Sequence, residues 1–338
     1  MFSIATLLTS LLGSDPTYVQ KNDIPPRLQW NHNYGYCGET SFICAGLYLG
    51  QYCSQYTARS LASGGAPQYS SSSQLLLGVN DTQAADQMSL NYDKWQYETQ
   101  SSPPQGSTQD FLVWVKHHVA SGHPVIIGIF NNEYLIYGKT NPTAGDPEYD
   151  HIVPVIGVGS YSTPIDDGNY HGTDELYFTD NGLYPSTSPT FFYQSSFDAF
   201  QLTRQEANAK NGPVYSLLVS PDHYAIALLS VYDDDDVTLP VNLKTSVNTE
   251  LPQIGEGKDT PPTAKPLTLT VLVSGLTSGS AYNLYLYNDF SNVPEKNFNS
   301  TPYTQKFAFT ASGDTYTMTH AIMSNETAVF RAVPVTAP

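Results

Sequence analysis

The sequence predicts an α+β protein in which a part with mixed helices and strands is followed by an all-β part. Up to about residue 213, apolar segments alternate between helical and strand periodicity; after it, short alternating strands follow one another with Gly, Pro, Asn and Asp between them. The composition agrees, because only 13% of the residues are charged while 25 Tyr, 24 Pro and 24 Gly favour turns and strands. We therefore expect a boundary between Asn211 and Asp222, with domains at residues 15–213 and 214–338.

Residues 1–14 are expected to be either a secretory signal segment or an N-terminal helix packed on the first domain. The apolar run from Phe2 to Leu12 is typical of a signal peptide, although no basic region precedes it. Glycosylation sequons, which would suit an exported protein, stand at Asn80, Asn299 and Asn325. We expect a secreted or extracellular protein without a membrane span, because no other stretch reaches about 18 apolar residues.

In the first part, apolar residues between Cys37 and Leu49 occupy nearly every side of a helix that Gly50 would end. Such a helix is typical of the centre of a domain. Further helices are expected at residues 57–62, 82–95 and 108–120, the last one capped by Thr108. Strands are expected at residues 124–130, 151–158 and 175–179.

The second part is expected to be a β-sandwich, because its short strands follow one another at the density typical of that architecture. The expected strands are residues 214–219, 224–231, 239–245, 267–273, 282–287, 306–310, 315–321 and 328–333. The segment from Val273 to Tyr282 resembles the loop-to-strand corner of fibronectin type III modules, in which a Leu and a Tyr pack across a turn. This resemblance implies a fibronectin III-like sandwich.

The charge of the chain bears on its partners. A net charge of −17 and a pI near 4.6 make long-range encounters with nucleic acids and anionic membranes repulsive, so we expect neither as a partner. Peptides, proteins and neutral glycans are better partners, and the sandwich is the candidate surface for a glycan.

We expect no metal ion and no other cofactor. The run from Asp233 to Asp236 does not have the spacing of an EF-hand and is better interpreted as a solvated turn than as a calcium site. His117, His118 and His123 cluster in sequence, but the two adjacent histidines point in different directions on a helix and no Cys or carboxylate stands at ligand spacing.

Cys37 is the residue that bears most directly on function, because it stands where a turn meets the expected buried helix. The positive end of the helix dipole stabilises a thiolate over a thiol at this position. A thiolate that attacks an acyl carbon also needs an oxyanion donor, a base and a group that orients the base. Gln29 and the Cys37 backbone N–H are candidate oxyanion donors, and His151, at the mouth of an apolar strand, is the candidate base.

The group that orients the base is less determined by the sequence. Asp180 follows a neighbouring strand and could accept a hydrogen bond from the imidazole of His151. Asn181 competes with Asp180 for this role, and Asp150 is a weaker third candidate.

The order of these residues resembles that of the papain-like cysteine peptidases, and more closely their C39-like branch, in which Asp takes the orienting position. The resemblance covers about residues 25–185 and implies that Gln29 is the oxyanion residue, Cys37 the nucleophile, His151 the base and Asp180 the orienting carboxylate. The segment 122–128 also resembles the strand that precedes the histidine in that branch.

The sequence departs from the papain pattern around the thiol. The stretch from Gln29 to Cys37 is longer than in papain, and Glu39 stands near the position of an aromatic residue. A carboxylate beside the thiol opposes thiolate formation unless it points away or is paired.

The other two cysteines have structural interpretations. An odd count of three leaves at least one thiol outside any disulfide. Cys44, on the same helix, is expected in the protein core, and a bridge between Cys44 and Cys53 remains an alternative if the chain folds back at Gly50.

These observations favour a cysteine peptidase-like thiol hydrolase that cleaves a peptide or isopeptide bond through a Cys37 thioester, with His151 as base and then as acid. Release of the thioester to an amine would make the protein an acyl transferase instead. The alternative of another class is a non-catalytic protein that binds a peptide or glycan on the same fold, which Glu39 and the long loop before Cys37 favour.

Overall fold

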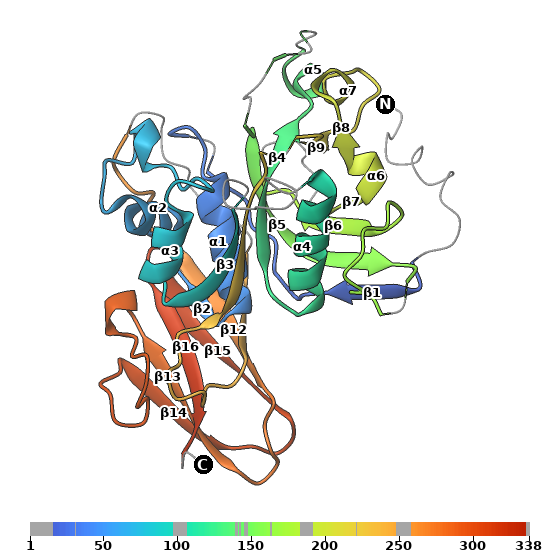
Figure 1. Ribbon diagram of the computed structural model, residues 1–338. Helices are drawn as coiled ribbons and strands as arrows, with labels where there is room; N and C mark the ends of the chain where they lie inside the picture. The colour runs from blue at the N-terminus through green and yellow to red at the C-terminus, as the bar shows by residue number, and fades with distance from the viewer. Residues whose placement is uncertain are drawn as a thin grey trace.

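The computed structural model describes residues 16–30, 32–96, 107–138, 141, 143–144, 148–162, 164–182, 192–220, 222–247 and 258–335. The expected signal segment at residues 1–14 lies outside the described residues. The fold is α+β, with a large mixed part and a β-rich part beside it (Figure 1). Among the described residues, no helix combines the length and the apolar character needed to cross a membrane.

A nine-stranded sheet forms the centre of the large part. Its main path runs through β3 (Leu90–Gln96), β10 (Tyr224–Val231), β4 (Val125–Asn131), β5 (His151–Ser160), β6 (Glu175–Thr179) and β7 (Phe192–Ser196). Off this path, β1 (Tyr18–Lys21) pairs with β5, β9 (Tyr215–Leu218) with β4, and β8 (Gln201–Leu202) with β9. Because β4 and β5 are buried along their whole length, residues at the ends of these strands can be held rigidly away from water.

Helices cover both faces of this sheet. On one face, α1 (Cys37–Tyr48) packs Phe42 against Ile126 and Ile152, and on the other, α4 (Thr108–Ala120) packs against Ile127 and Val153. Alternate residues of one strand point to opposite faces, which is why neighbours in β4 and β5 contact different helices. Figure 1 shows α1 and α4 on opposite sides of β5.

The shorter helices of the large part are α2 (Gln55–Ser63), α3 (Asp81–Gln87), α5 (Glu133–Tyr137), α6 (Phe197–Phe200), α7 (Arg204–Ala207) and the 3-10 turn η2 (Ser71–Ser73). A second 3-10 turn, η3 (Phe290–Asn292), lies between β13 and β14 of the β-rich part. The cap of α4 is Ser107, not the expected Thr108, and it forms a capping box with Asp110.

The expected helix at residues 82–95 is wrong in its second half. Helix α3 ends at Gln87, Ser89 adopts a φ of 54°, and β3 begins at Leu90. The stretch from Leu90 to Asp93 alternates between apolar and polar residues, and pairing with β10 satisfies its backbone as a strand. The expectation failed because this period-two pattern directly follows a helical one.

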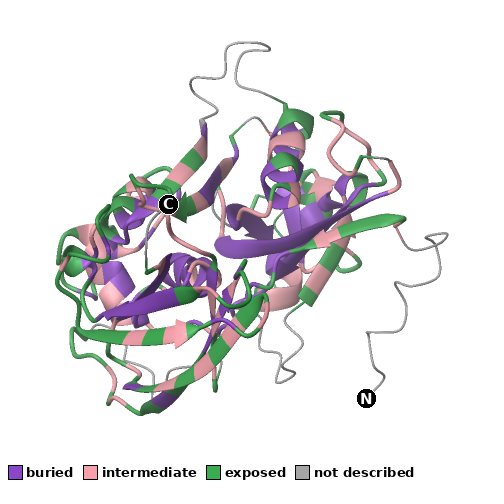
Figure 2. Ribbon diagram, turned by 90° about the horizontal axis from the view of Figure 1, so that it is seen from below, coloured by how far each residue is buried: buried purple, intermediate pink, exposed green. Residues whose placement is uncertain are grey.

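The β-rich part consists of two sheets that enclose one core. One sheet contains β11 (Val241–Thr245), β12 (Pro266–Ser274) and β15 (Thr315–Met323). The other contains β14 (Gln305–Thr310), β13 (Ala281–Tyr287), β16 (Ala328–Pro334) and β2 (Gln51–Tyr52). We call these two sheets the sandwich. In Figure 2, interior strands are coloured as buried along most of their length, whereas strands at the surface alternate between buried and exposed residues.

The corner between β12 and β13 has a hydrogen bond that fixes its shape. Leu276 and Tyr282 are both buried, and the Tyr282 hydroxyl accepts a 2.9 Å hydrogen bond from the Thr277 N–H. The turn that the sequence pattern indicated is therefore held by the tyrosine across it.

The strand pairing does not follow the expected boundary between Asn211 and Asp222. Strands β9 and β10 pair with β4 and β3, so residues up to Val231 belong to the large sheet. In addition, β2 follows α1 in the chain but pairs with β16 of the sandwich. The change in sequence pattern near residue 213 marks the point after which the described residues form strands without a further α-helix, and it says nothing about the partners of those strands.

The expected alternative of a Cys44–Cys53 disulfide is not formed. Cys44 is buried on α1 beside Ile24, Ile156 and Tyr177, whereas Cys53 lies in the core that α1 shares with the sandwich. The two thiols therefore belong to different apolar clusters.

Candidate functional site

The chain reaches Cys37 through a tight turn. Asn33, Tyr34 and Gly35 all adopt positive φ values of 50°, 68° and 86°, and Tyr36 then caps α1. Cys37 is the first residue of the helix and is half-buried. The first N–H groups of a helix have no partner within it, so this position favours a negative charge on the side chain.

His151 opens β5 and is almost completely buried. Its Nε2 lies 3.1 Å from Asp180 Oδ1, and the Cys37 side chain interacts with the same ring. Because Nε2 faces Asp180, Nδ1 is the ring nitrogen that remains for Cys37.

The protonation of His151 follows from these contacts. Burial lowers the pKa of an imidazole, but the hydrogen bonds and negative charges of Asp180 and Cys37 outweigh burial and raise the pKa of His151 to about 9. An imidazolium at neutral pH is the partner that a thiolate nucleophile requires.

Asp180 follows β6 directly, and three groups stabilise its charge. Burial raises the pKa of this carboxyl, but the contact with His151, the hydrogen bond from the Gly182 N–H at 3.0 Å and the influence of the Tyr215 side chain lower it overall. The Tyr215 ring also stacks on His151, with ring centroids 5.7 Å apart. Sequence analysis missed Tyr215 because it assigned residues 214–219 to the sandwich.

Asn181 has a different role from Asp180. Its Nδ2 donates to the backbone carbonyls of Cys37 at 3.0 Å and Ile152 at 2.9 Å. The Ser41 hydroxyl donates to the same two carbonyls. Asn181 therefore ties α1 to β5 and does not contact the imidazole through these bonds.

Asp150 is also directed elsewhere. Its carboxylate pairs with Arg204 at 3.1 Å and accepts a hydrogen bond from the Asn131 N–H. Of the candidate orienting groups, Asp180 is the one bonded to the His151 ring.

Gln29 lies beside the start of α1. Its side-chain Oε1 accepts a 2.9 Å hydrogen bond from the Tyr36 backbone N–H, and the Gln29 backbone N–H donates to the Asn181 backbone carbonyl at 2.7 Å. The backbone donor at Tyr36 identifies which end of the amide is oxygen, so the NH₂ end is available as a donor near Cys37.

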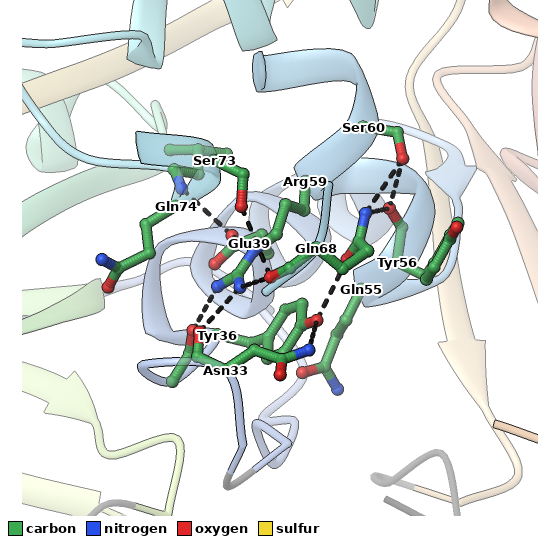
Figure 3. A network of polar contacts seen from close by, with 12 residues as sticks. Asn33, Tyr36, Glu39, Gln55, Tyr56, Arg59, Ser60, Gln68, Ser73 and Gln74 are labelled. Atoms are coloured by element: carbon green, nitrogen blue, oxygen red, sulfur yellow. Dashed lines mark hydrogen bonds and ion pairs between the residues drawn. The ribbon is translucent and has the colours of Figure 1, made fainter. Parts of the chain in front are cut away.

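Glu39 does not oppose a thiolate with an unpaired charge. It is buried, and Arg59 Nε lies 2.6 Å from its Oε1, which also accepts from the Leu75 N–H at 3.0 Å. Figure 3 shows Arg59 and Glu39 at the centre of a polar network. The carboxylate is thus paired, which is the condition under which its effect on Cys37 is small.

The same arginine holds the turn before Cys37. Arg59 donates to the carbonyls of Asn33 at 2.8 Å and Gln68 at 3.0 Å, and also to the Gly35 carbonyl. Its guanidinium lies 3.6 Å from the centre of the Tyr36 ring. One buried cation therefore fixes three points around the turn (Figure 3).

The histidines and aspartates considered as metal ligands have protein partners. His117 pairs with Asp166 at 2.7 Å, and His118 contacts His123 and Asp93 at 3.2 Å. In the run from 233 to 236, Asp233 Oδ2 accepts two backbone hydrogen bonds within its turn. Among the described residues, no group of three or more ligating side chains is arranged to hold a metal ion.

Comparisons with known proteins do not assign the chain to a family. No protein-family model matches it, and neither a curated protein nor a solved structure is similar to it at a significant level. The interpretation of the site therefore depends on its geometry.

Proposed function

We propose that the protein is a papain-like, more closely C39-like, cysteine hydrolase that cleaves a peptide or isopeptide bond. The observation that carries this proposal is the continuous chain of contacts from Cys37 through the His151 ring to Asp180 Oδ1, which lies 3.1 Å from Nε2. A nucleophile, a base and a group that orients the base in hydrogen-bonding sequence are the requirements for thiol catalysis.

In the proposed reaction, the Cys37 thiolate attacks the substrate carbonyl carbon and forms a C–S bond. The C–N bond then breaks, and the leaving amine takes the proton that His151 carries. Water attacks the resulting thioester, His151 accepts a proton from that water, and the carboxylic acid leaves as Cys37 is regenerated. Asp180 keeps the ring oriented and stabilises its positive charge throughout.

The oxyanion of each tetrahedral intermediate needs donors on the Gln29 side of the thiol. The Gln29 NH₂ and the Cys37 backbone N–H are the groups proposed for this role, because Gln29 is bonded to the residue next to Cys37. The pairing of Glu39 with Arg59 also supports the hydrolase over a binding protein with an inactive site.

The experiment is alkylation of Cys37 by iodoacetamide, located by mass spectrometry. We expect Cys37 to react faster than the thiol of glutathione at pH 7, and His151→Ala to remove that advantage. The matched control is His117→Ala, because His117 is exposed and bonded to Asp166. If Cys37 reacts no faster than glutathione and His151→Ala changes nothing, the hydrolase proposal is wrong and the binding alternative remains.

A further inference from the structure

The sandwich contacts the chain at the end of α1, and the connection between two of its strands contacts the turn before α1. At the far end, the Phe330 N–H donates to the Gly50 carbonyl at 2.8 Å, and Asn242 donates to the Tyr48 carbonyl. A Cβ at Gly50 would lie 2.9 Å from the Val241 Cβ, so the sandwich also fits closely against the residues that end α1. Rigid contacts of this kind fix the position of the helix along its axis.

Arg331 of β16 strengthens this far contact with a buried charge. Its guanidinium donates to Gln51 Oε1 at 2.9 Å and to the Leu49 carbonyl at 3.5 Å, directly after α1. These partners are neutral, and burial lowers the pKa of Arg331 to about 10. Burying a cation among neutral acceptors costs free energy, so the contact between Arg331 and the end of α1 is made at a cost in folding stability.

The turn before α1 is held by the connection between β11 and β12. Asn33 donates to the Lys258 carbonyl at 2.9 Å, and the Asp259 carboxylate accepts from the Gln68 N–H. The Tyr56 hydroxyl donates to the Asp259 carbonyl at 3.3 Å. Asn33, Tyr56 and Gln68 belong to the polar network of Figure 3, so the connection between β11 and β12 is bonded to the network that shapes the turn before Cys37.

Gln68 joins this contact to the site. Its carbonyl accepts from Arg59, and its Oε1 accepts a 3.0 Å hydrogen bond from the Tyr36 hydroxyl. Tyr36 is the residue before Cys37, and its N–H holds Gln29. Hydrogen bonds therefore connect Asp259 through Gln68 and Tyr36 to Gln29, and Tyr36 is the direct neighbour of Cys37 in the chain.

We propose that the sandwich is a positioning module of the Cys37 site, which holds the end of α1 and the turn before it and whose loosening lowers the reactivity of Cys37. The inference rests on the proposed function and adds a means of regulation to it, because a displacement of the sandwich would change the reactivity of Cys37. Asp259 and Arg331 are then positioning residues.

The test uses the full chain and two readouts. The first is the rate of Cys37 alkylation by iodoacetamide, and the second is amide hydrogen exchange in the peptide that covers residues 29–41. Asp259→Ala and Arg331→Met should each slow alkylation by between about twofold and tenfold, the effect of one or two hydrogen bonds, and should raise exchange in that peptide.

Matched variants separate positioning from general destabilisation. Asp259→Asn keeps an oxygen acceptor for the Gln68 N–H and should restore the wild-type rate. Asp289→Ala removes an exposed carboxylate that caps η3 in the same sandwich and should leave both readouts unchanged. If Arg331→Met does not fold, Asn242→Ala tests the far end of α1 instead.

The outcomes distinguish this inference from the hydrolase proposal. Alkylation that depends on His151 but not on Asp259 or Arg331, with unchanged exchange at residues 29–41, overturns the inference alone. Alkylation that is independent of His151 overturns the hydrolase proposal, and hydrogen exchange then still reports whether the sandwich holds the helix.

Discussion

Arg59 Nε lies 2.6 Å from Glu39 Oε1, and both side chains are almost completely buried. Removing the arginine would leave a buried carboxylate without its partner, which typically costs about 3–5 kcal/mol. We expect Arg59→Met to lower the free energy of unfolding by about that amount in urea denaturation. Lys244→Ala is the control, because its ion pair with Asp23 is exposed on both sides and should contribute less than about 1 kcal/mol.

Arg59→Lys should not rescue the first variant. The guanidinium reaches the carbonyls of Asn33, Gly35 and Gln68 as well as Glu39, and a lysine has too few donors in one plane to replace it. Wild-type stability for Arg59→Lys would show that the charge alone matters and that the hydrogen-bond geometry does not.

The pKa of His151 predicts how stability depends on pH. Because the folded-state pKa of about 9 is above the usual value of 6.5, the imidazolium stabilises the fold fully below pH 6.5, and this contribution is lost as pH rises through about 9. Thermal unfolding of wild type and His151→Ala should therefore differ most at pH 6 and converge toward pH 10. A difference that stays constant over this range would mean that folding does not raise the pKa of His151.

Tyr215 should influence the Asp180–His151 pair from outside the expected peptidase region. The Tyr215 side chain lowers the pKa of Asp180, so removing its hydroxyl takes a favourable interaction from the ionised carboxylate. We expect Tyr215→Phe to raise the pKa of Asp180 and to slow iodoacetamide labelling of Cys37. Tyr303→Phe, on an exposed tyrosine of the sandwich, is the control. Equal labelling rates for Tyr215→Phe and wild type would remove Tyr215 from the site.

Gly38 is required by the close approach of two backbones. A Cβ at this position would overlap the carbonyl group of Leu75, whose N–H is bonded to Glu39. Gly38→Ala should therefore destabilise the protein by about 1–3 kcal/mol, as overpacking does. Gly313→Ala has open space around the new methyl group and should be nearly neutral in the same denaturation experiment.

Local sequence patterns were sufficient to place three residues of the site. Three patterns correspond to three elements of the structure: the buried apolar pattern after Cys37 to α1, the apolar run after His151 to β5, and the strand before Asp180 to β6. Each pattern is contained within a few residues of the side chain that it positions, so it can be interpreted without knowing the fold.

The rest of the site depends on contacts between distant segments. Tyr215 reaches Asp180 because β9 pairs with β4, and nothing in residues 214–219 identifies that partner. The pairing of Glu39 with Arg59 likewise joins two helices whose packing the sequence does not specify. Strand partners and buried ion pairs are non-local, which is why the boundary near residue 213 and the concern about Glu39 could not be resolved from the sequence.

The two residues of β2 determine whether the sandwich can be expressed as a separate fragment. They cover the edge of β16, where Ala328 pairs with Tyr52 and Val329 with Gln51. An uncovered edge strand presents free backbone donors and acceptors and promotes aggregation. Residues 241–335 expressed alone would carry this exposed edge, so the sandwich is expected to be soluble only with the segment after α1, and the whole chain to unfold as one cooperative unit.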